Sequence, residues 1–110
     1  MTTINKNFNP LAGFPKTRGL TILKDQFNNI IFVRGTAKVG IREDIRILLH
    51  EMKNGCKDWS DHRREAYLNA HGVYFDYISM DGCKDQEIYD TATLLDRNSI
   101  SQLIKQKKVA

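Results

Sequence analysis

Three basic side chains stand close together in the sequence at the point where a helix is expected to begin. Arg34 and Lys38 lie in the segment before this helix, and Arg42 lies in its first turn. The first backbone N–H groups of a helix have no partner within the helix, and the helix dipole adds positive potential at the same end. Together with the cationic side chains, these groups form a cradle suited to phosphate. The alternative is that the side chains are solvated charges on a loop.

The same helix carries a second set of polar residues with regular spacing. Arg42, Arg46 and His50 recur at every fourth position and would line one stripe of the helix. A neighbouring apolar stripe follows the spacing i, i+4, i+7, i+8 and i+11: Ile41, Ile45, Leu48, Leu49 and Met52. This pattern predicts an amphipathic helix, and Gly55 after it predicts a left-handed cap. The candidate nucleic-acid contacts are four cations on and before this helix: Arg34, Lys38, Arg42 and Arg46.

Two extended segments before the helix must position these residues. Residues 20–24 are rich in Ile and Leu, residues 30–33 are β-branched and aromatic, and the Asp and Asn residues between them favour a turn. We expect the two segments to pair as a hairpin, with Ile22, Ile30 and Phe32 on the core side.

A third extended segment and two more helices follow. Residues 73–78 alternate poorly in polarity, which is typical of a central strand covered on both faces. Residues 61–70 are expected to be helical, with Arg63 exposed. Residues 84–95 are expected to form a last helix, and Asp96 after it either ends this helix or caps the next one. The expected fold class is α+β: a small three-stranded, mainly antiparallel sheet flanked by three or four helices.

The chain is expected to form one domain with short extensions. The length of 110 residues suits a single core. Residues 19–104 hold the sheet and helices. Residues 1–18 are interpreted as an extended N-terminal arm docked through Leu11 and Phe14, and residues 105–110 as a basic C-terminal tail.

Short motifs along most of the chain follow the order of a known family. Gly19-Leu20-Thr21 and Phe32-Val33-Arg34-Gly35 lie in the two strands of the hairpin, Thr36-Ala37-Lys38 follows, and Asn69-Ala70-His71-Gly72 precedes the third strand. This order resembles the GIY-YIG nuclease superfamily, in particular the domain of phage homing endonucleases, which has Gly-Ile-Tyr and Tyr-Val-Gly at the first two places. Arg34 is one residue more than that pattern holds, which predicts a bulge at the end of the second strand. The resemblance implies the three-stranded fold given above.

The resemblance also implies catalytic roles for residues of the hairpin and of the last helix. The family presents two motif tyrosines to the scissile phosphate, and Thr21 and Phe32 take their places here. Thr21 keeps a hydroxyl without the reach or acidity of a phenol, and Phe32 has neither donor nor acceptor. The family binds its metal ion through a glutamate on the late helix, and Asp96 takes that place as a shorter carboxylate ligand for Mg²⁺.

The family's first helix carries an arginine that stabilises phosphate charge and often a histidine one turn later. Arg46 and His50 have that spacing, after a register shift of about one helical turn. Ungapped counting from the hairpin puts Glu43 at the place of the arginine, and counting back from Gly55 puts Asp44 there. The resemblance therefore gives as candidate catalytic residues Thr21, Arg46 and His50, and as candidate metal ligand Asp96.

Each of these candidate positions departs from the family's residue or register. We therefore expect a GIY-YIG-like protein whose nuclease site has been lost and which acts by binding, either to nucleic acid or to a protein target as a phage-type inhibitor. The alternative is an active Mg²⁺-dependent DNA endonuclease. No cofactor is expected in the first case and Mg²⁺ in the second. The expected partner is DNA or a host or phage protein, and the sequence leaves the oligomeric state open.

Charge and composition limit the class of protein. The net charge is +4, with the basic excess in the first 60 residues, and this suits a surface that faces phosphate. The alternative is a globular protein that merely has excess Lys. A chain that is 41% hydrophobic and 27% charged is globular rather than disordered. Because no apolar run is long enough to cross a bilayer and no apolar leader opens the chain, we expect a cytoplasmic protein without a membrane partner.

Overall fold

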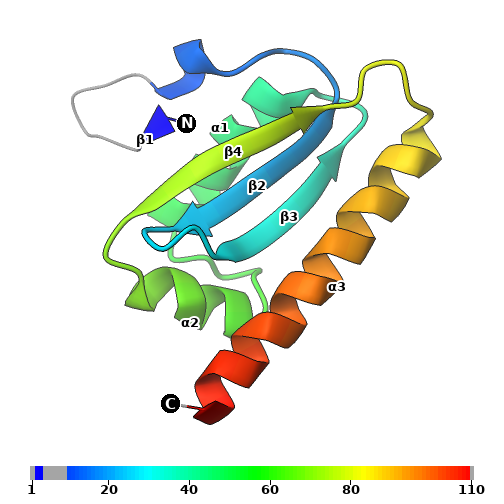
Figure 1. The fold of residues 1–110 in the computed structure, drawn as a ribbon. Coiled ribbons are helices and arrows are strands. Elements are labelled where there is room, and N and C mark those ends of the chain that lie inside the picture. Colours follow the sequence, from blue (N-terminus) through cyan, green and yellow to red (C-terminus); the bar gives the residue numbers. More distant parts are fainter. Residues whose placement is uncertain (1, 4–9, 110) are drawn as a thin grey trace.

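The structure, a computed structural model, describes residues 2–3 and 10–109. It is an α+β fold with an open antiparallel sheet and three α-helices (Figure 1). The strands are β1 (Thr2–Thr3), β2 (Gly19–Asp25), β3 (Ile30–Thr36) and β4 (Val73–Ser79). The helices are the 3-10 helix η1 (Pro10–Gly13) and the α-helices α1 (Ile41–Lys53), α2 (Asp61–Asn69) and α3 (Asp85–Val109). The expected fold class is therefore confirmed. None of the helices in the described ranges is both long and apolar enough to cross a membrane.

The sheet has the strand order β1-β4-β2-β3, and every neighbouring pair is antiparallel. β2 pairs with β3 on one edge and with β4 on the other, so the expected hairpin is confirmed. Its turn is held by the Asp25 carboxylate, which accepts the N–H groups of Phe27 and Asn29, each at 2.9 Å. Asn28 between them has a φ of 69°, a left-handed conformation that Asn tolerates better than most residues.

One irregularity interrupts the hairpin. Ile31 is an extra residue on β3, between the residues that pair with Leu23 and Lys24. The bulge expected at Arg34 is therefore wrong, because Arg34 keeps the regular register of the ladder. The extra residue lets Ile31 and Phe32, although adjacent, enter the same buried cluster.

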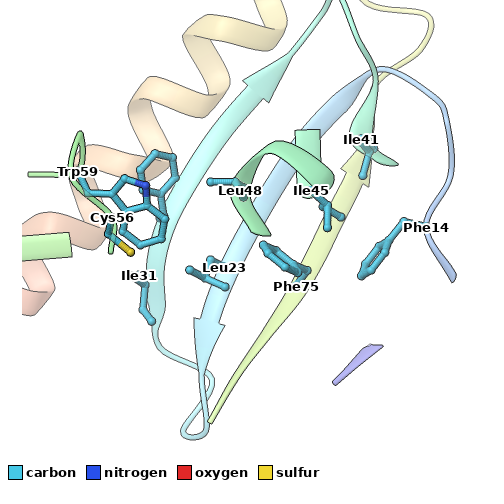
Figure 2. Close-up of a cluster of buried hydrophobic side chains, with 10 residues drawn as sticks. Phe14, Leu23, Ile31, Ile41, Ile45, Leu48, Cys56, Trp59 and Phe75 are labelled. Atoms are coloured by element: carbon cyan, nitrogen blue, oxygen red, sulfur yellow. The ribbon is translucent and has the colours of Figure 1, made fainter. Parts of the chain in front are cut away.

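Side chains are buried on both faces of the sheet. On the α1 face, Figure 2 shows Leu23 and Phe75 beneath Leu48 of α1, with Trp59 on the β3 side and Phe14 on the β4 side. The α3 face buries a second cluster: Leu20, Ile22, Val33, Ala37, Ile88 and Ala92. Two helices on opposite faces therefore enclose the hairpin between them (Figure 1).

These two clusters decide where the expected core residues lie. Ile22 and Ile30 belong to the α3 face and Phe32 to the α1 face, so the single core side predicted for the hairpin is wrong. Alternation along a strand places neighbouring side chains on opposite faces, and here both faces are covered. Phe14 is buried and Leu11 packs against the same cluster, as expected for a docked arm.

β4 is not the strand covered on both faces that the sequence predicts. Tyr77 and Ile78 near its end are 39% and 47% exposed. α3 packs across β3, at the opposite edge of the described sheet, and this leaves the second half of β4 in contact with solvent (Figure 1). A poor alternation of polarity therefore did not signal burial in this strand.

The last helix is longer than predicted. α3 continues without a break from Asp85 to Val109, so Asp96 lies inside a helix rather than at an end. The segment contains neither Gly nor Pro, and nothing in its backbone chemistry forces a stop. The other two helices agree with the predicted bounds to within one residue, and Gly55 adopts the expected left-handed conformation with a φ of 86°.

Gly40, the residue before α1, allows a test of how the arm is seated. Its φ is +85°, and a Cβ at this position would lie 2.4 Å from the carbonyl oxygen of Lys16. Gly55 has a nearly equal φ of +86° with nothing within 4 Å of a Cβ. Both changes to Ala carry left-handed strain of about 1 kcal/mol, but only Gly40→Ala forces the arm to move. Urea unfolding should show Gly40→Ala losing at least about 1–2 kcal/mol more than Gly55→Ala. Equal losses would contradict this seating.

Candidate functional site

The place where the sequence predicts a nuclease centre holds an ion-pair network. Thr21 on β2 is fully buried and lies opposite Arg34 on β3. Nε of Arg34 donates to Oδ1 of Asp44 at 2.8 Å, Nη2 forms an ion pair with the same oxygen at 2.8 Å, and only 5% of Asp44 is exposed. A guanidinium from the sheet is thus joined to a carboxylate from the inner face of α1.

A second carboxylate completes this arrangement. Nη1 of Arg34 lies 3.4 Å from both carboxylate oxygens of Glu51, and Nε1 of Trp59 donates to the same carboxylate at 3.2 Å. The guanidinium is therefore held between two acidic side chains of one helix. We call the five residues involved the Arg34 network: Thr21, Arg34, Asp44, Glu51 and Trp59.

Asp44 is the least well satisfied member of the Arg34 network. Its Oδ2 and the hydroxyl of Thr21 are both buried without a hydrogen-bond partner among the described residues. Burial raises the pKa of the Asp44 carboxyl, and Arg34 and the nearby Thr21 hydroxyl offset only part of that rise. Thr21 therefore lies in the interior beside a carboxylate, away from the surface at which a water would be activated.

Asp96, the candidate metal ligand, belongs to a separate network at the free edge of β3. Its Oδ1 accepts the backbone N–H of Val33 at 3.1 Å, and its Oδ2 pairs with the guanidinium of Arg63 from α2. That guanidinium also lies over the ring of Phe32, 4.5 Å from the centroid. We call the four residues the Asp96 network: Phe32, Val33, Arg63 and Asp96. Both oxygens of the carboxylate already have protein partners.

The remaining candidate catalytic residues lie on the outer side of α1. Arg46 is exposed and pairs with Glu43 one turn earlier, with Nε at 2.9 Å from Oε1. His50 is exposed, and its Nε2 lies 2.9 Å from Nδ2 of Asn54. Arg46, His50 and Asp96 thus contact three different partners, and the Thr21 hydroxyl has no hydrogen-bond partner among the described residues. Within residues 2–3 and 10–109, no three His, Cys, Asp or Glu side chains gather to hold a metal ion.

Three of the four candidate nucleic-acid contacts are engaged inside the protein. Arg34 belongs to the network above, Arg46 pairs with Glu43, and Nε of Arg42 donates to the carbonyl oxygen of Phe14 at 2.7 Å. Lys38 is exposed and makes no hydrogen bond or ion pair with any residue that the structure describes.

The backbone groups of the expected phosphate cradle are engaged as well. The N–H of Ile41 donates to the carbonyl of Thr17 at 2.8 Å, and the N–H of Arg42 donates to the carbonyl of Pro15 at 2.9 Å. The arm thus supplies the acceptors that the first turn of α1 needs. In this conformation these amides are not available to a phosphate.

Six residues of the two networks were not among the sequence candidates: Phe32, Val33, Asp44, Glu51, Trp59 and Arg63. The helical pattern placed Arg63 on the exposed side of α2, which is wrong because its guanidinium packs over Phe32. A Trp in a loop directly before a helix is a signal of burial that could have identified Trp59. Glu51 lies seven residues after Asp44, two helical turns along the same face, and that spacing is visible in the sequence.

A shallow hollow lies apart from both networks. It has a volume of about 390 Å³ and is lined by residues from the ends of α1 and α2 and the start of β4: Met52, Tyr67, Leu68, Ala70, His71, Gly72 and Val73. Leu68 at its rim is 68% exposed. The lining combines polar and apolar surface and includes the imidazole of His71.

The comparisons with known proteins add no relative. No protein-family model, no curated protein and no solved structure matches this chain. Its function is therefore argued from the arrangement of its own residues.

Burial of Asp44 predicts a particular dependence of stability on pH. Because its pKa is raised in the folded state, stability from this group is complete below the unfolded pKa of about 3.9 and is lost as the pH rises through the folded pKa. The Asp44→Asn variant lacks this loss, because an amide does not ionise. The free energy of unfolding of the wild type, minus that of Asp44→Asn, should therefore fall as the pH rises above the unfolded pKa of about 3.9. A difference that rises with pH would mean that Arg34 lowers the pKa of Asp44 by more than burial raises it.

The Asp96 network predicts a structural role for its carboxylate. Asp96→Ala leaves the Arg63 guanidinium and the Val33 N–H without their partner, so we expect a loss of about 3 kcal/mol in urea unfolding. Asp90→Ala, an exposed change on the same helix, should lose less than about 0.5 kcal/mol. Added Mg²⁺ should leave the Tm of the wild type unchanged. A rise in Tm with Mg²⁺ that Asp96→Ala abolishes would instead assign Asp96 to a metal site.

Proposed function

We propose that this protein is a GIY-YIG-like domain without nuclease chemistry that acts by binding another protein. Phosphodiester cleavage of that class needs an activated water, a cation for phosphate charge and a carboxylate free to hold Mg²⁺. The observation that carries the proposal is the Arg34 network. At the position that the resemblance gives to the catalytic centre lies an internal ion pair, with Thr21 buried beside it.

The contacts of the cations favour a protein partner over nucleic acid. A phosphate that approached Arg34, Arg42 or Arg46 would have to displace a carboxylate or a carbonyl already bonded to it. Large apolar side chains, in contrast, are exposed in the turn of the hairpin, at the rim of the hollow and on β4: Phe27, Leu68, Tyr77 and Ile78. Apolar surface that is contiguous suits contact with protein, and among these side chains Tyr77 and Ile78 are neighbours in β4.

Nucleic-acid binding is the second candidate, and one observation favours it. Lys38 is exposed in the loop before α1, and Lys16, also exposed, belongs to the arm segment whose backbone lies against Gly40 in that loop. These two ammonium groups could contact a phosphate backbone without breaking an internal pair. The Mg²⁺-dependent endonuclease is less well supported, because Asp96 would have to leave both Arg63 and Val33 to hold the metal.

Incubation with duplex DNA and Mg²⁺, followed for cleavage and for mobility shift, separates these functions. We expect no cleavage, and at most a weak shift that is lost between about 50 and 200 mM salt. A strong shift whose affinity falls steeply with salt, and that Lys38→Ala weakens while the exposed control Lys57→Ala does not, would favour nucleic acid. Nicking that requires both Mg²⁺ and an intact Asp96 would overturn the proposal.

A further inference from the structure

The outer edge of β4, which faces away from β2, is only partly paired. β1 binds this edge at two positions, with Thr2 opposite Phe75 and Thr3 opposite Tyr74 (Figure 1). Residues 77–79 face no strand in the part of the chain that the structure describes. An unpaired strand edge offers its N–H and C=O groups to any extended chain that can reach it.

The direction of these groups follows from the neighbouring hydrogen bonds. The N–H of Met80 donates to the carbonyl of Arg18 at 2.8 Å, on the β2 side. Successive residues of a strand alternate in direction, so the main-chain groups of Tyr77 and Ser79 turn outward. The Tyr77 N–H donates to the carboxylate of Asp76 at 2.8 Å. The Tyr77 C=O and the Ser79 N–H remain without a partner among the described residues.

The side chains beside these groups are apolar on both faces of the sheet. Ile78 lies on the α3 face of the sheet, at a position that α3 does not cover, and Tyr77 lies on the α1 face. The Tyr77 ring meets the ring of Phe14 edge-on, with centroids 6.0 Å apart. A strand added at this edge would set its own side chains alternately beside Tyr77 and Ile78.

We propose that residues 77–79 of β4 accept an extended segment of a partner protein as an additional antiparallel strand. This inference rests on the proposed protein-binding function and names its surface and its mode. Main-chain hydrogen bonds to Tyr77 and Ser79 supply affinity, and apolar side chains at alternate positions of the segment supply specificity. β1 already pairs with the same edge in the same orientation, so the site continues an interface that this fold forms within itself.

A second copy of this chain fits the edge less well than a partner segment. Antiparallel pairing must set outward-facing residues opposite each other, and Phe75 is already paired with β1. Only Tyr77 and Ser79 remain as outward-facing residues. In a symmetric pair of copies, Tyr77 would lie opposite Ser79 of the other copy and Ile78 opposite Ile78, so each copy would contribute three residues. That contact is far below the roughly 800 Å² per partner of a standard interface. An extended partner segment can add contacts beyond the paired residues.

The edge can be blocked without disturbing the sheet. Ser79→Pro removes the outward N–H, while the bonds between β4 and β2 use other residues. It also removes the hydroxyl that lies 2.9 Å from that of Thr17, so Ser79→Ala is its control. Ile78→Lys places a charge on the apolar flank of the same site. Leu68→Lys and Leu94→Lys are matched controls, because both replace exposed Leu residues away from this edge. Circular dichroism and urea unfolding establish that each variant is folded.

The probe is a phage-displayed library of short random peptides selected on the full-length chain. We expect enriched peptides to alternate apolar and polar residues and to bind Ser79→Pro and Ile78→Lys at least about tenfold more weakly than the wild type, the fold-change of about one lost hydrogen bond. Binding to the three control variants should be unchanged. Light scattering should show a monomer with and without peptide.

Two other outcomes separate this inference from the function on which it rests. Peptides that bind Ser79→Pro and Ile78→Lys as tightly as the wild type, but lose binding to Leu68→Lys, would overturn the edge as the site and leave protein binding standing. A library that yields no enriched peptide, together with a salt-sensitive DNA shift that depends on Lys38, would overturn both. If the wild type is a dimer and Ile78→Lys dissociates it, the occupant of the edge is a second copy of this chain and not a partner segment.

Discussion

The partly buried Arg34 guanidinium is the constraint on which the rest of this structure depends. An arginine stays charged at any ordinary pH, so one placed between a sheet and a helix needs counter-charges at fixed positions. Asp44 and Glu51 supply them from the same face of α1, two helical turns apart. This fixes the rotation of α1. It directs the apolar stripe of the helix onto the sheet and turns Arg46 and His50 toward solvent, which is why the candidate catalytic residues do not meet.

The other polar contacts close the remaining boundaries of the core. The arm supplies carbonyl acceptors to the first turn of α1. On the outer edge of β3, the Asp96 carboxylate accepts a backbone N–H, and Arg63 neutralises the charge of that carboxylate. Three of the side chains expected to bind phosphate or metal, Arg34, Arg42 and Asp96, thereby hold the elements together. Open to a partner are exposed apolar side chains, Lys16 and Lys38, and the second half of β4, where Tyr77 and Ile78 flank unpaired main-chain groups. This distribution suits recognition of a protein segment.

Local signals predicted the elements, and tertiary contacts decided the site. Turn chemistry, apolar spacing and Gly55 correctly gave the hairpin, α1 and α2, because each depends on neighbours in the chain. The length of α3 was missed because Asp96 looked like a helix cap, whereas its carboxylate binds a strand 63 residues earlier. Counting had already put Asp44 where the nuclease family has its arginine. Periodicity could not show that the cation beside Asp44 comes from Arg34 on the sheet. It also could not show that Arg63 contacts β3.

The coupling between Arg34 and Asp44 tests this account most directly. It is measured as a double-mutant cycle of Arg34→Met, Asp44→Asn and the double variant, from urea unfolding at neutral pH. Burial makes the pair costly to form, yet each partner depends on the other once both are buried. We expect a favourable coupling energy of about 2 kcal/mol. A coupling of less than about 0.5 kcal/mol would mean that the two groups are independent, and that the Arg34 network does not hold α1 against the sheet.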